Sequence, residues 1–142
     1  MADNFKAFMA ENAIKYNEVE YVASERFVDE NGKPIPWRFR ILTEAESQKI
    51  RAKCKKRVTD ARTRQTSIET DNEKYNDLMI EQCVVYPNLN DAALQESYGA
   101  VGAAELARTM LLPGEYADLS MAITEANGFD SGMADKIKRV KN

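Results

Sequence analysis

The sequence predicts an α+β fold, with a short helix and a β-hairpin over residues 1–42 and a mainly α-helical bundle of short helices over residues 43–142. The β signal is a run of β-branched and aromatic residues on both sides of Asn31-Gly32, the dipeptide most typical of tight hairpin turns. The helical signal is the recurrence of capping residues, Pro and Gly between amphipathic segments after residue 43. A chain of 142 residues suffices for a single domain with one modest core.

The first expected element is a short helix over residues 3–12. Asp3 is placed to cap it, and Phe5, Phe8 and Met9 recur at helical spacing. We expect this helix to precede the hairpin within one N-terminal unit.

The hairpin is expected to pair a strand within residues 19–28 with a return strand over residues 36–42. Trp37, Phe39 and Ile41 alternate with arginines, so the apolar side chains share one face. Two prolines at the start of the return strand predict an edge position, because proline cannot donate to the ladder. A lone hairpin is marginally stable in water. Its aromatic face must therefore pack on the helices, gain an extra strand or pair with another subunit.

A helix is expected over residues 44–57. Thr43 and Glu46 have the spacing of a capping box, in which each side chain accepts a backbone N–H of the other residue. The apolar stripe is thin, with Ile50 and Cys54 as its main members. Most of this helix is therefore expected to face water or a partner.

Residues 59–69 have almost no apolar content, and the sequence predicts a mobile loop there. Further helices should follow, separated by Pro and Gly. The first should be capped near Thr70 and end before Pro87, and a short second helix should be capped by residues 88–91 and end at Gly99. A helix rich in small residues is expected over residues 102–112, followed by an amphipathic helix over residues 115–127 that ends at Gly128. A last helix is expected over residues 131–140.

The side chains needed for common catalytic sites are largely missing. Histidine is absent, which removes the commonest general base and His-containing metal sites. Cys54 and Cys83 are expected to be small, unbridged core residues, because each occupies an apolar position of a predicted helix. We therefore expect a binding protein and not an enzyme, with no catalytic residues, cofactor or metal.

No signal peptide or membrane span is expected, so the chain should remain in the cytosol.

Charge is unevenly distributed along the chain. Residues 49–64 hold eight basic residues and one acid, whereas residues 65–135 hold two basic residues and thirteen acids. The basic stretch is open to three interpretations: a solvated face, a docking site for an acidic protein surface, or a nucleic-acid contact. The acidic remainder of the chain argues against nucleic acid. The basic candidates for partner contact are Lys49, Lys53, Lys56 and Arg57.

Three segments resemble, in spacing and order, the XkdN-like family of tail assembly chaperones found in phages and defective prophages of Gram-positive bacteria. They are residues 19–37, which hold the Asn31-Gly32 turn; residues 85–99, which begin Val85-Tyr86-Pro87-Asn88; and residues 110–119, which begin Met110-Leu111-Leu112-Pro113-Gly114. The likeness extends from about residue 5 to residue 130.

The resemblance implies a chaperone that binds the tape-measure protein and promotes assembly of the tail tube. It also implies tail tube subunits as partners, self-association, and a location in the host bacterial cytoplasm. Neither a membrane nor a nucleic-acid partner is expected. A structural component retained in the mature virion tail is one alternative, and a small nucleic-acid-binding regulator is another. The apolar candidates for client contact are the hairpin residues Trp37 and Phe39 and the helix residues Tyr116, Leu119 and Ile123.

Overall fold

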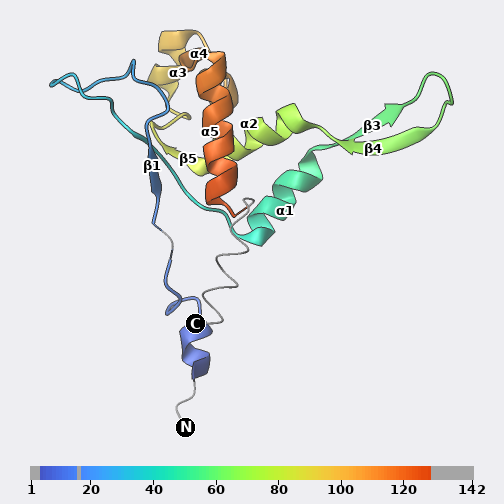
Figure 1. Cartoon of the computed structure of the whole chain (residues 1–142), viewed down its shortest axis with the longest axis horizontal. Helices are drawn as coiled ribbons and strands as arrows, with labels where there is room; N and C mark the ends of the chain where they lie inside the picture. Colours follow the sequence, from blue (N-terminus) through green and yellow to red (C-terminus); the bar gives the residue numbers. More distant parts are fainter. Residues whose placement is uncertain (1–3, 16, 129–142) are drawn as a thin grey trace.

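A three-stranded antiparallel sheet lies at the centre of the fold (Figure 1). The computed structural model describes residues 4–15 and 17–128 of the chain. Strand β1 (Val19–Tyr21) pairs with β2 (Trp37–Phe39), and β2 pairs with β5 (Val84–Tyr86). The α+β class is confirmed, and β5 is the extra strand that the hairpin gains.

The predicted edge position of the return strand is wrong, because β2 is the central strand of this sheet. Both prolines lie before the ladder. Pro34 forms an isolated bridge with Val28, and Pro36 immediately precedes the first residue of β2. Neither proline therefore has to donate a hydrogen bond within the strand.

The turn between these strands lies at the predicted position. Gly32 has a φ of +79°, a conformation that glycine adopts without strain. The Asp29 carboxylate accepts hydrogen bonds from the amides of Asn31 and Lys33, and the Asp29 amide donates to the Lys33 carbonyl at 2.8 Å. Because strands β1 and β2 are each only three residues long, this turn lies within a long loop that connects them.

The hydrophobic core lies between the sheet and three helices. Trp37 and Phe39 are buried on the same side of β2. They form one core cluster with residues of α2 (Asn72–Cys83), α4 (Ala103–Met110) and α5 (Pro113–Ala126). Helix α2 packs against both α4 and α5. Of the three fates expected for the aromatic face, packing on the chain's own helices and gain of a strand both occur.

Helix α1 (Glu44–Lys53) begins at Thr43, and the predicted capping box is confirmed. The Glu46 amide donates to the Thr43 hydroxyl at 3.3 Å, and the Glu46 carboxylate accepts from the Thr43 amide at 3.1 Å. The helix is shorter than the predicted range of 44–57, because Cys54 caps its C-terminus.

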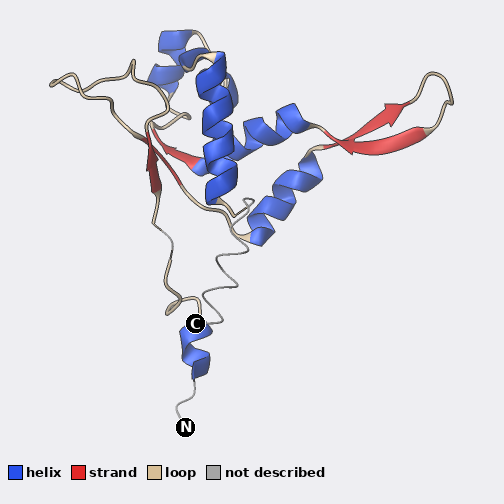
Figure 2. Cartoon of the chain, viewed as in Figure 1, coloured by secondary structure: helices blue, strands red, loops and turns tan. Residues whose placement is uncertain are grey.

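Residues 59–69 lie in a second β-hairpin and not in the expected loop. Strand β3 (Lys55–Thr59) pairs with β4 (Thr66–Thr70) in a separate two-stranded sheet. β-Branched residues occupy half of these ten positions, and such residues favour strands whether or not they are apolar. Figure 2 shows this hairpin projecting away from the helices.

The caps of the later helices are close to the predicted positions. Asp71, one residue after Thr70, caps α2 by accepting the Lys74 amide. Helix α3 (Ala92–Tyr98) is capped by Asp91 and closed by Gly99, as predicted. Helix α5 starts at Pro113, two residues before the predicted start, because proline at the first helical position needs no N–H partner.

Of the two helices predicted near the ends of the chain, only the N-terminal one can be compared with the structure. The predicted helix over residues 3–12 corresponds to a shorter 3₁₀ helix, η1 (Asn4–Phe8). The predicted helix over residues 131–140 lies outside the described residues. Within residues 4–15 and 17–128, every helix is too short or too polar to cross a bilayer.

Candidate interaction surfaces

Four of the predicted partner-contact residues are buried in the core. Trp37, Phe39, Leu119 and Ile123 each have at most 2 % of their surface exposed. A partner cannot reach these side chains in this structure. The idea that the aromatic hairpin face or the α5 stripe covers a client is therefore corrected: both surfaces are used for internal packing.

Tyr116, the fifth apolar candidate, is half-buried in a polar cluster that joins three helices. Its hydroxyl donates to Asp77 on α2 at 2.6 Å, and Arg108 on α4 forms an ion pair with the same carboxylate at 2.5 Å. Burial raises the pKa of the Tyr116 hydroxyl, and its hydrogen bond to Asp77 acts in the same direction. This residue therefore fixes α5 against α2 and α4.

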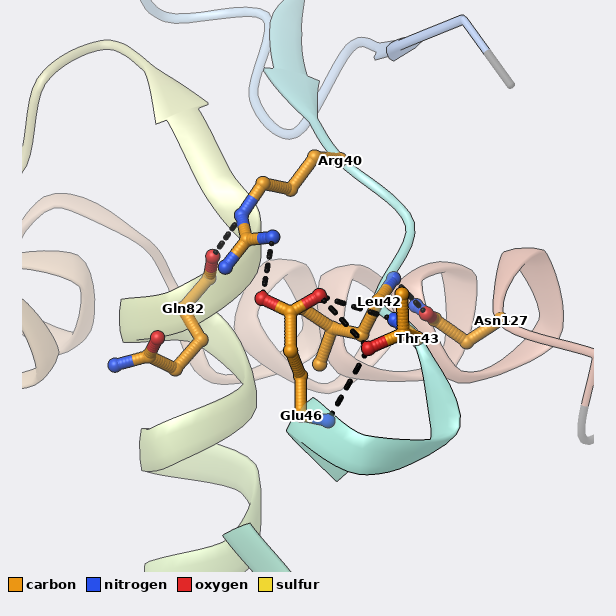
Figure 3. A network of polar contacts seen from close by, with 6 residues as sticks. All are labelled: Arg40, Leu42, Thr43, Glu46, Gln82 and Asn127. Carbon is orange, nitrogen blue, oxygen red and sulfur yellow. Dashed lines mark hydrogen bonds and ion pairs between the residues drawn. The ribbon is translucent and has the colours of Figure 1, made fainter. Parts of the chain in front are cut away.

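A second polar network holds the start of α1 against the body (Figure 3). The Arg40 guanidinium donates to Glu46 at 2.9 Å and to the Gln82 carbonyl at 2.8 Å. The hydrogen bond from the Thr43 amide and the contact with Arg40 lower the pKa of Glu46. Asn127, after α5, accepts the Leu42 amide at 2.8 Å. The network joins four elements and fixes the helix from which the second hairpin extends.

The two cysteines are free and fully buried, which confirms the prediction of unbridged core residues. Burial raises the pKa of the Cys83 thiol to about 11 and also raises that of Cys54. Thiols with a raised pKa are poor nucleophiles and poor metal ligands at neutral pH. In the described part of the chain, no three Cys, Asp or Glu side chains are grouped so that they could hold a metal ion.

The second hairpin, residues 55–70, is the most distinctive exposed surface, and we call it the basic arm. Its side chains are exposed except Val58, which is partly buried. It carries five cations and two acids. The ion pairs found among the described residues include none of these five cations.

Strand pairing divides the arm into two faces. Arg57 lies opposite Ile68, and Lys55 lies opposite Thr70, so these four side chains share a face. Ile68 is 66 % exposed there. On the other face Lys56 lies opposite Glu69. One face of the arm therefore combines two cations with an exposed apolar side chain.

The structure splits the four predicted basic candidates between two elements. Lys49 and Lys53 lie on α1 and line a hollow of about 200 Å³ beside α2. Lys56 and Arg57 lie on β3. A larger hollow of about 520 Å³ opens at the base of the arm, where Lys55 and Thr70 meet α1 and α2.

Sequence reasoning missed three contributors to this surface: Lys55, Ile68 and the strand edges themselves. The signal was present as alternation in Thr66-Ser67-Ile68-Glu69-Thr70, which places β-branched residues at a spacing of two. Because several of these β-branched residues are polar threonines, a search for alternating apolar residues did not detect the strands.

Comparison with known proteins assigns the chain to a family. The sequence model described as "Phage XkdN-like tail assembly chaperone protein, TAC" matches residues 5–141. The chain belongs to this family of phage tail assembly chaperones. The predicted resemblance is thereby confirmed over nearly the whole chain.

Relatives of this chaperone occur in Bacillus subtilis (strain 168). The protein YqbN is 31 % identical over 138 residues, which cover 95 % of this chain and 91 % of YqbN. The phage-like element PBSX protein XkdN is 28 % identical with the same coverage. The crystal structure of YqbN matches with a TM-score of 0.74 at 27 % identity, covering 92 % of this chain and 100 % of that one. The chaperone is therefore similar to these proteins in both sequence and fold.

Proposed function

We propose that this tail assembly chaperone binds the tape-measure protein of its own tail through the basic arm and thereby promotes assembly of the tail tube. It acts in the cytoplasm of the host bacterium and leaves the client as tail tube subunits polymerise. The observation that carries this proposal is the arm: an exposed two-stranded ribbon whose cations lack ion-pair partners in the described part of the chain.

The physical state of the arm supports a binding role. A two-stranded ribbon is marginally stable in water, and this one lies away from the core. Each outer edge presents unpaired backbone N–H and C=O groups, to which an extended segment can add as a third strand. The face with Lys55, Arg57 and Ile68 favours a client segment that is acidic and partly apolar.

Such a contact also suits reversible binding. Exposed ion pairs each contribute only about 0–1 kcal/mol, so several weak contacts along the arm hold a client without trapping it. The base of the arm adds the 520 Å³ hollow, which has room for client side chains. A chaperone that tube subunits later displace needs a contact surface that is extended but whose individual interactions are weak.

The test is co-expression with the tape-measure protein from the same gene cluster, comparing wild type with Arg57→Glu. Arg57 is the suitable position because its cross-strand partner is Ile68, whereas a glutamate at position 56 would face Glu69 and destabilise the ribbon. We expect wild type to keep the client soluble and co-purify with it, and Arg57→Glu to lose most of both effects.

The matched control is Lys33→Glu, which makes the same change of charge at an exposed turn outside the arm. Retained client binding by Arg57→Glu would overturn the proposal. Two further measurements address the alternatives. Abundant chaperone in purified mature tails would indicate a retained structural component, and tight DNA binding at physiological salt would indicate a nucleic-acid-binding regulator.

A further inference from the structure

The 520 Å³ hollow at the base of the basic arm has walls from three parts of the chain. Gln48, Arg51 and Ala52 share one face of α1, because residues three and four apart in a helix are neighbours. Lys55 and Thr70, which pair across the arm, form a second wall, and the start of α2 forms the third. Figure 1 shows α1 and α2 meeting the arm at this point. The hollow therefore lies where the arm joins the body.

The walls of this hollow carry hydrogen-bond donors, and no carboxylate of the described residues lines it. Arg51 and Lys55 are cations. Four neutral residues each add an amide or hydroxyl donor: Gln48, Thr70, Asn72 and Tyr75. By contrast, a hollow of about 360 Å³ beside Arg108 is lined by two acids, Glu73 and Asp77. The larger hollow therefore favours an anionic ligand.

Arg51 is held in position and still has donors for a ligand. Its guanidinium donates to the Ser47 hydroxyl at 2.8 Å and forms an ion pair with Glu44. A guanidinium has five N–H groups, so these two contacts, found among the described residues, leave three. The pair with Glu44 is itself an example of this group binding a carboxylate. Arg51 is therefore fixed in place before a ligand arrives.

Tyr75 and Lys55 add a hydroxyl and a second cation to the walls. Burial raises the pKa of the Tyr75 hydroxyl, so this group stays protonated and able to donate at neutral pH. Arg51 acts on this pKa in the opposite direction, because its positive charge lies near Tyr75. Lys55 is exposed and forms no ion pair with another described residue. The hollow therefore presents a protonated hydroxyl together with two positive charges.

The hollow continues into one face of the arm. Lys55 lies two residues before Arg57 on β3, so both side chains are on the same face, about 7 Å apart. In the two-stranded sheet of the described residues, β3 has one unpaired edge, to which an extended peptide can add as a further strand. The peptide side chains that face Lys55 and Arg57 would then also be two residues apart.

We propose that the hollow binds one carboxylate of an extended, acidic client segment, and that Arg57 binds a second carboxylate two residues along that segment. Arg51, Lys55 and Tyr75 hold the first carboxylate. The ligand is a peptide because Ile68, exposed on the same face as Arg57, offers an apolar contact that a free phosphate cannot use. The inference rests on the proposed function, since it names the chemistry by which the arm selects its client.

The first experiment compares two labelled threonine-rich peptides of identical composition. One has two glutamates at alternate positions, and the other has the same two glutamates adjacent. Alternate side chains share one face of an extended peptide, whereas adjacent ones point to opposite faces. We expect the full-length chaperone to bind the alternating peptide at least about threefold more tightly, measured by fluorescence anisotropy. Equal affinities, or no binding of either peptide, would overturn the inference.

The second experiment locates the contact with single substitutions. Lys55→Gln removes a charge and Tyr75→Phe removes only a hydroxyl, and each should weaken binding of the alternating peptide about three- to tenfold. Lys33→Gln removes an exposed charge outside the arm and should leave the affinity unchanged. Thermal midpoints close to that of wild type confirm that the variants are folded. An equal loss of affinity in Lys33→Gln and Lys55→Gln would overturn the assignment to the hollow.

Two comparisons separate this inference from its alternatives. Sodium phosphate and sodium chloride at equal ionic strength should weaken peptide binding equally, and stronger competition by phosphate would overturn the assignment to carboxylates. Loss of the client by Arg57→Glu, combined with equal affinities for the two peptides, would overturn this inference and leave the proposed function intact. Retention of the client by Arg57→Glu would overturn the proposed function itself.

Discussion

Leu119 and Met121 lie two residues apart on α5 and have opposite environments. Leu119 is fully buried, whereas Met121 is largely exposed. Burial of Leu119 explains why an amphipathic stripe predicted from the sequence is a packing surface and not a client-binding one. Periodicity shows which side chains share a face, but it does not show whether that face meets the chain's own core or a partner.

Substitution at these two positions tests that assignment. Leu119→Ala should lower the free energy of unfolding by about 2–5 kcal/mol, because it removes buried methyl groups and leaves a cavity. Met121→Ala should change it by less than about 0.5 kcal/mol. Urea denaturation of both variants provides the measurement. Equal effects at the two positions would contradict the packing assignment.

Glu46 makes stability depend on pH through its lowered pKa. The folded-state pKa lies below the ordinary value of 4.5, so the unfolded state binds more protons between the two values. The contribution of Glu46 is therefore complete above pH 4.5 and is lost as pH falls through the folded-state pKa. Glu46→Gln should be less stable than wild type at pH 7, and this difference should shrink below pH 4.5. Denaturation midpoints at pH 3–7 test this, and a difference that grows toward acid would contradict it.

At the scale of elements, the sequence predicts what local rules determine. The Asn31-Gly32 turn, the Thr43 cap and the Gly99 stop all lie where turn and cap chemistry places them. Pairing over long distances is not encoded locally. Strand β5 completes the sheet from more than forty residues beyond β2, and only the folded chain brings them together. The basic arm was missed for a different reason, because its strands bury almost nothing and so lack an apolar pattern.

The arm should be separable from the body. Its ends are already joined, because the Asp71 amide donates to the Cys54 carbonyl at 2.6 Å. Replacing residues 55–70 with Asn-Gly retains this bond as the hydrogen bond of a two-residue turn. We expect the armless chain to keep its thermal midpoint within a few degrees and to lose the client. A large fall in the midpoint would show that the arm supports the core.

At the scale of the whole molecule, charge and apolar surface lie on different projections. The basic arm carries cations that form no ion pair with another described residue, and the N-terminal segment, residues 4–15, carries exposed apolar side chains at another end of the body (Figure 1). The two projections therefore use different forces. One is suited to an acidic client, and the other presents apolar surface.

The exposed charge of the basic arm predicts how client binding responds to salt. The range of electrostatic interactions falls from about 10 Å at 0.1 M salt to about 3 Å at 1 M, so binding of the client through the arm should weaken as salt rises. Client affinity measured across one sodium chloride series provides the test. A client affinity that stayed constant across the series would contradict an electrostatic contact through the arm, because exposed charges are the ones that salt screens most.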